Sequence, residues 1–129
     1  MADDLIPDDV RQFILRNIDS IAQLEALLLL RGNPPEAWSV HAVAKRLYIS
    51  DDETAPLLVR LCEQGFVVAE SGAPVQYRYQ PATTELAQMI DRVAGIYSKQ
   101  LVPVTRLIHS KPRTRIQEFA DAFKLRKDE

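Results

Sequence analysis

The stretch from residue 39 to residue 79 constrains the fold of this 129-residue chain more than any other part of it. Apolar residues at helical spacing predict a helix over Val40–Leu47 and, after a tight break, a second helix that ends near Gln64. A Gly-Ala-Pro tip then separates two segments of strand type, at about Val67–Ala69 and Gln76–Tyr79. The predicted order is helix, turn, helix, strand, tip and strand, which is the order of a winged helix-turn-helix.

Helices are also expected before this core. A proline, two aspartates and an apolar residue at every fourth position predict a helix over about Pro7–Asp19. Ser20 and Gln23 have the spacing of a capping box, which predicts a new helix that continues to about Leu30. Gly32 is expected to end that helix in the left-handed conformation.

A long helix is expected after the core, from Thr83 or Thr84 to about His109, with a kink or break just upstream of Pro103. A further helix is expected to begin near Thr114. The long helix carries a sustained apolar stripe that could dock another helix or a second subunit. We assign a dimer seam to its members: Leu86, Ile90, Val93, Tyr97, Leu101, Val104 and Ile108.

The predicted fold class is mainly α with a small β-hairpin wing. We expect one domain over residues 1–129, with an N-terminal helix in 1–19, the winged helix-turn-helix core in 20–82 and the C-terminal helices, which would dimerise, in 83–129. No run approaches the ~18 apolar residues that cross a bilayer, the first residues lack the basic opening of a secretory signal, and the single cysteine cannot form an internal disulfide. These features favour a cytoplasmic protein.

Residues 47–67 resemble bacterial winged helix-turn-helix regulators, particularly the antibiotic-resistance-regulator-like group. In that group a helix, a serine-containing turn and a helix with two spaced leucines lead into Gly-(Leu/Phe)-Val. The corresponding residues here are Leu47, Ile49, Ser50, Leu58, Leu61, Gly65, Phe66 and Val67. The resemblance implies a dimeric regulator that binds DNA with the second helix of the motif.

The second helix departs from that group at the positions that would face DNA. Where the group usually has Ser, Thr, Arg, Lys or Gln, this chain has Asp51, Asp52, Ala55, Pro56 and Val59. Carboxylates are repelled by phosphates, and because they only accept hydrogen bonds, they can bind few of the groups on base edges. The run of Asp51, Asp52 and Glu53 is therefore either a partner-facing acidic patch or an ordinary acidic first turn that complements the helix dipole.

Pro56 leaves two possible starts for this helix. If the helix begins at Asp51, the proline removes an internal hydrogen bond at a cost of about 3 kcal/mol. If Thr54 caps a shortened helix, Pro56 falls in the first turn, where proline is tolerated. We expect the second arrangement.

Positive charge is concentrated outside the helix-turn-helix. Residues 1–19 carry a net charge of −3, residues 20–82 carry −2 and residues 83–129 carry +3, whereas a nucleic-acid binder usually gathers cations on its binding surface. If the chain binds DNA, phosphate contacts should be modest and salt-dependent. They are expected from Lys45, Arg46, Arg60 and Arg78, with Lys111, Arg113 and Arg115 as auxiliary clamps.

Three functions stay open at this point. The leading hypothesis is a homodimeric transcriptional regulator that binds double-stranded DNA weakly, through phosphate contacts. The alternative is a protein–protein interaction module that has lost base readout, and the third is a small-ligand sensor with a pocket around Trp38, Phe13 and Tyr97. We expect no enzyme, metal or cofactor, because His41 and His109 lack nearby ligands at metal-binding spacing and no glycine-rich phosphate loop occurs.

Overall fold

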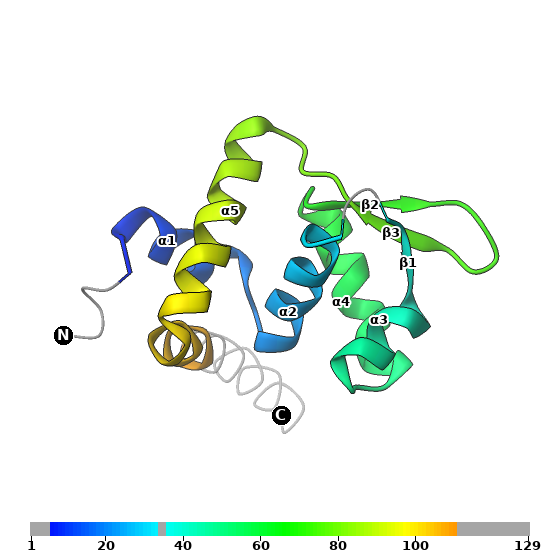
Figure 1. Cartoon of the computed structure of the whole chain (residues 1–129), viewed down its shortest axis with the longest axis horizontal. Coiled ribbons are helices and arrows are strands. Elements are labelled where there is room, and N and C mark those ends of the chain that lie inside the picture. Colours follow the sequence, from blue (N-terminus) through cyan, green and yellow to red (C-terminus); the bar gives the residue numbers. More distant parts are fainter. Residues whose placement is uncertain (1–5, 34–35, 111–129) are drawn as a thin grey trace, which may run out of the picture.

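The computed structural model describes residues 6–33 and 36–110. Figure 1 shows α1 and α5 on one side, α2 in the middle, and α3, α4 and a small sheet on the other side. The mainly helical fold with a wing is confirmed, whereas the helix expected from Thr114 lies outside the described residues. The elements are α1 (Asp8–Asn17), α2 (Ile21–Arg31), β1 (Trp38–Ser39), α3 (Val40–Leu47), α4 (Asp51–Glu63), β2 (Val67–Glu70), β3 (Gln76–Tyr79) and α5 (Thr84–Lys99), followed by a helical stretch at 101–110.

Hydroxyl side chains set the starts of helices α2 to α5. In each, the hydroxyl oxygen accepts a hydrogen bond from a main-chain N–H three residues further on, at 3.0–3.1 Å. Such a cap stabilises a helix by about 1 kcal/mol. The caps are Ser20, Ser39, Ser50 and Thr83. Ser20 was expected from the sequence and Thr83 was one of two expected starts, whereas Ser50 takes the place of the expected Thr54.

The end of α2 differs from the expectation. Gly32 has a φ of −73°, so it continues the right-handed turn, and the predicted left-handed cap is wrong. The last carbonyl groups are satisfied in another way. The Gly32 N–H donates to the carbonyl of Leu28, and the Asn33 side chain donates to the carbonyl of Leu29 at 2.9 Å.

The start of α4 also corrects the sequence prediction. The helix begins at Asp51 with a complete capping box between Ser50 and Glu53, and Pro56 lies in its interior. Thr54 is buried and does not cap the helix, because its hydroxyl donates back to the Ser50 carbonyl at 2.8 Å. The carbonyl that Pro56 leaves without a helical donor belongs to the exposed Asp52, where water can bond to it.

The sheet has one strand more than expected. Its order is β1-β3-β2, with β2 and β3 forming the antiparallel hairpin of the wing. The two-residue strand β1 pairs with β3, so that Trp38 lies opposite Tyr77 and both side chains are buried. This pairing ties the start of α3 to the wing.

The apolar stripe of α5 faces the core of its own chain. Ile90, Val93 and Tyr97 of α5 are buried, as are Val104 and Ile108 in the stretch 101–110. Assigning these five to a seam between subunits is therefore wrong, because the single chain already uses that face. Of the other two seam residues, Leu86 is half-buried and Leu101 is 53% exposed.

The expected break upstream of Pro103 is present. Helix α5 ends at Lys99, and Gln100 leaves the helical conformation before the stretch 101–110 begins. We refer to α1, α5 and the stretch 101–110 as the terminal helices. Asp9 of α1 forms an ion pair with Arg92 of α5, which joins the first two of them at the surface.

Candidate nucleic-acid interface

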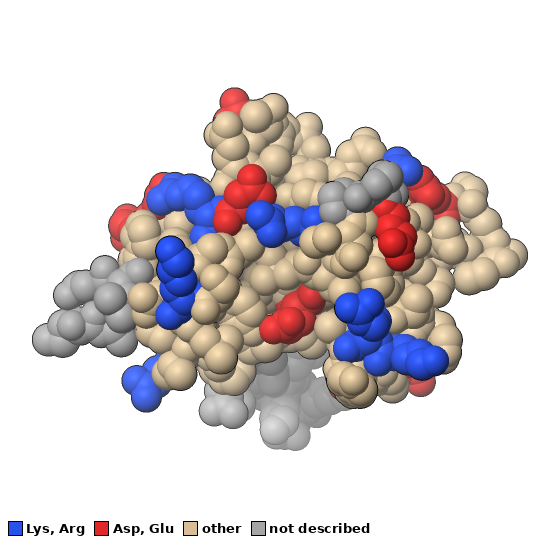
Figure 2. Space-filling view, in the orientation of Figure 1, with Lys and Arg blue, Asp and Glu red and all other residues tan. Residues whose placement is uncertain are grey.

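Two cations lie together at the C-terminal end of α3. Lys45 and Arg46 occupy the last helical turn and are both exposed. The Arg46 guanidinium lies over the ring of Trp38, 5.4 Å from its centre, a distance at which a cation–π contact is favourable. Figure 2 shows Lys and Arg gathered over this end of α3. The pair is thus placed where a phosphate could reach it.

The other two expected DNA contacts already have acidic partners. The Nε of Arg60 lies 3.6 Å from the carboxylate of Asp19, and Arg78 pairs with Glu70 across the wing. Exposed ion pairs of this kind contribute only about 0–1 kcal/mol. Both arginines could exchange their partners for phosphate, but each would first leave a carboxylate beside the DNA.

The first part of the exposed surface of α4 carries no cation, and the one exposed cation of this helix, Arg60, is paired with Asp19. The residues of the exposed face recur at intervals of four, three and four positions, as expected for one side of a helix. They are Asp52, Pro56, Val59 and Glu63. No Lys or Arg occurs from residue 51 to residue 59. The helix at the position of a DNA-recognition helix therefore presents carboxylates at both ends and apolar groups between them, with the paired Arg60 beside Glu63.

The three acidic residues in the first turn of α4 have different surroundings. The Nδ1 of His41 lies 3.2 Å from the Asp51 carboxylate, which joins α3 to α4. Glu53 accepts from the Ser50 N–H at 3.3 Å and from the Ser50 hydroxyl at 3.1 Å, so it completes the capping box. Asp52 belongs to the exposed face of α4. Two of the three carboxylates thus have structural partners, and one faces outward.

The three residues expected around a ligand pocket, Trp38, Phe13 and Tyr97, have other partners in the fold. The Phe13 ring packs against Phe66 at 5.8 Å between ring centres, and the hydroxyl of Tyr97 donates to Glu25 at 2.6 Å. Burial and this hydrogen bond raise the pKa of Tyr97 to about 12, so it stays a protonated donor that joins α5 to α2.

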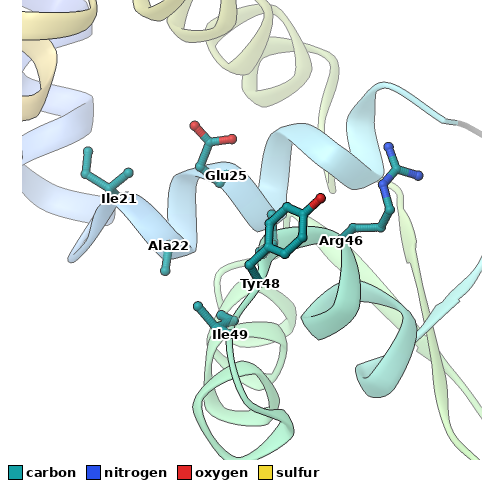
Figure 3. A pocket seen from close by; sticks show the side chains of 7 residues that line it. Ile21, Ala22, Glu25, Arg46, Tyr48 and Ile49 are labelled. Carbon is teal, nitrogen blue, oxygen red and sulfur yellow. The ribbon is translucent and has the colours of Figure 1, made fainter.

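A hollow of about 380 Å³ lies elsewhere, between α2 and the turn of the helix-turn-helix. Figure 3 shows its side chains, which come from α2 on one side and from the end of α3 and the turn on the other. Tyr48 in that turn is 94% exposed and has a left-handed φ of 61°, which is uncommon for a residue other than glycine. The lining residues are Ile21, Ala22, Glu25, Arg46, Leu47, Tyr48 and Ile49.

The remaining expectations concern the C-terminal cations, metal sites and membrane spans. Lys111, Arg113 and Arg115 lie outside the described residues. In residues 6–33 and 36–110, no group of three or more metal-binding side chains is gathered. None of the helices in this part of the chain is both long and apolar enough to span a bilayer.

Known structures identify the fold. No protein-family profile and no curated protein sequence matches the chain. A mutant of MarR from E. coli matches with a TM-score of 0.53 and 16% sequence identity, over 92% of this chain and 83% of that one. The chain has the MarR fold. A mutant of ZitR from Lactococcus lactis gives a TM-score of 0.50 at 18% identity, over 82% of this chain and 73% of its own.

The MarR fold confirms the resemblance that residues 47–67 indicate, at the level of architecture. In a winged helix-turn-helix, α4 is the element that would enter the major groove, and the β2–β3 wing lies beside it. Sequence identities of 16% and 18% do not carry an activity across. The function must therefore be argued from this chain's own side chains.

Proposed function

We propose that this chain is a transcriptional regulator of the MarR fold that binds double-stranded DNA through phosphate contacts and does not read bases with α4. The observation that carries the proposal is the pair Lys45 and Arg46. Both are exposed, and neither has a carboxylate partner within the part of the chain that the structure describes. Phosphate contacts position a protein on DNA without selecting a sequence. Weak binding with little sequence preference is the expected result.

The exposed face of α4 supports a second candidate function, a protein-interaction module. Asp52 and Glu63 flank Pro56 and Val59 on that face, and the neighbouring cation, Arg60, is already paired with Asp19. A basic partner with an apolar centre would suit such a surface better than a phosphate backbone would. The chain would then regulate through another protein, with the winged scaffold as its support.

We further propose that the chain assembles as a homodimer through the stretch 101–110. Leu101 and Val102 are adjacent there, 53% and 57% exposed, so apolar surface is available outside the monomer core. This assembly would use only Leu101 of the seam assigned from the sequence. Pairing two chains would double the number of phosphate contacts on one duplex.

A salt titration of duplex binding separates the two functions. Fluorescence polarisation with several unrelated labelled duplexes should give dissociation constants on the order of 10⁻⁴–10⁻⁶ M near physiological salt, with little difference among sequences. The plot of log K against log salt should have a slope of about −2 for the two cations of one chain and about −4 for a dimer. Absence of binding even at about 50 mM salt would favour the interaction module.

A further inference from the structure

Amide groups join the α1–α2 junction to the C-terminal end of α4. The side-chain nitrogen of Gln23 donates to the main-chain carbonyl of Asn17 and to the side-chain oxygen of Gln64, both at 3.0 Å. The side-chain nitrogen of Gln64 donates to the same Asn17 carbonyl at 2.6 Å. The side-chain oxygen of Gln23 accepts from the N–H of Asp19, also at 2.6 Å. We call Asn17, Gln23 and Gln64 the amide clasp.

The clasp is unusual because its central member is buried. Gln23 is 1% exposed and lies in a helix whose other buried residues are leucine and alanine. A buried amide costs free energy unless its donors and acceptor are bonded, and here they are. A fully bonded buried polar group fixes one geometry more narrowly than apolar packing does, since each bond has a preferred length and direction.

Other contacts at the same end of α4 reinforce the clasp. Arg60 of α4 pairs with Asp19, and Phe66, just after α4, packs its ring against Phe13 of α1. The opposite end of α4 follows the turn that borders the hollow beside α2. The helix-turn-helix is thus held to the α1–α2 junction at one end and borders open space near the other.

We propose that the amide clasp is the joint that sets the orientation of α4 relative to the terminal helices. Gln23 and Gln64 are then positioning residues, and a displacement of α1 passes through Asn17 to α4. The consequence for DNA rests on the proposed function: the clasp would hold Lys45 and Arg46 at a fixed angle to the terminal helices. Motion about this joint would be a hinge, with the hollow beside α2 as the space available to it.

The direct test measures the orientation itself. In the full-length chain, the native cysteine is first removed by Cys62→Ala. Cysteines for spin labelling are then introduced at two exposed positions, Gln12 on α1 and Asp52 on α4. Pulsed electron paramagnetic resonance should give one narrow distribution of distances between the two labels when the clasp is intact. Gln64→Leu should broaden and shift it while the circular dichroism spectrum is unchanged. Gln64→Glu, which keeps the acceptor for Gln23 and removes the donor to Asn17, should broaden it less.

Tyr97→Phe is the matched control. It removes a tertiary hydrogen bond between α5 and α2 that does not involve α4, so it should lower stability without changing the distance distribution. Duplex binding should weaken about two- to tenfold in the clasp variants, at an unchanged salt slope, because only preorganisation is reduced.

If Gln64→Leu and Gln64→Glu both give the same distance distribution as the parent protein, the proposal that the clasp sets the orientation of α4 is wrong. If the parent protein binds no duplex, the proposed function fails. The distance distributions then still decide whether the clasp sets the orientation of α4.

Discussion

Replacing Lys45 and Arg46 together by glutamate is expected to weaken duplex binding at least about tenfold at low salt. The two cations that would face phosphate are removed, and two carboxylates are added to a helix-turn-helix that already presents the exposed Asp51 and Asp52. The slope of log K against log salt should fall by about one for each phosphate that a chain no longer neutralises. Fluorescence polarisation across a salt series measures both quantities.

The control for this experiment carries the same change of charge at another place. Arg16→Glu with Lys99→Glu alters exposed cations of α1 and α5, far along the chain from α3 and outside the stretch 101–110 that is proposed to dimerise. It should reduce affinity only slightly, through the general field of the protein, and leave the salt slope nearly unchanged. Equal reductions of affinity in the two double variants would mean that α3 does not dock on the duplex.

Ile90→Asp is expected to destabilise the folded chain itself. Ile90 is fully buried in the core, and an aspartate there would place a carboxylate among apolar side chains with no partner. Effects of this kind exceed about 4 kcal/mol in the free energy of unfolding, which is much of the roughly 5–15 kcal/mol that a domain has. Urea denaturation followed by circular dichroism should show a collapsed midpoint or no folded baseline.

Leu101→Asp is the matched substitution outside the core. Because Leu101 is 53% exposed, its replacement should change the unfolding free energy of one chain by about 0.5 kcal/mol or less. Under the proposed assembly, it should instead lower the mass found by sedimentation to that of one chain. If Ile90→Asp stays folded and only separates subunits, the apolar stripe of α5 does not pack in the core of its own chain.

Much of the architecture was predictable from local chemistry. Ser20 stands just before apolar residues at helical spacing and became the cap that its position indicates, and Thr83 was one of two starts expected for α5. The break before Pro103 was predictable for the same reason, because proline restricts its own backbone and the preceding turn. These features depend on neighbours within four residues. The start of α4 was not predicted in this way, because Pro56 favoured Thr54 over Ser50 as the cap.

Features that depend on distant partners were not predictable. The periodicity of α5 shows that one face is buried, but it does not show whether α1 or a second subunit covers that face. Strand β1 has two residues and forms only because β3 lies beside it. Gln23 was recognised for its capping spacing, whereas its bonds to Asn17 and Gln64 need α4, 41 residues further along the chain, to be in place.

The candidate site was predicted only in part. The sequence identified Lys45 and Arg46 as exposed cations, but it could not show that Arg60 and Arg78 are paired with Asp19 and Glu70. Those carboxylates lie 41 and 8 positions away in the sequence. After the pairing, the helix-turn-helix has fewer cations available for phosphate than its composition suggests, which makes the end of α3 more important.

The decisive measurement is a map of backbone amide shifts in the ¹⁵N-labelled protein on addition of an unlabelled duplex. Contact through phosphates at the end of α3 predicts the largest changes from Lys45 to Ile49. It also predicts small changes along the exposed face of α4, from Asp52 to Val59. If the largest changes instead follow that face of α4, the helix enters the groove despite its carboxylates. The proposal that this protein holds DNA without base readout would then be wrong.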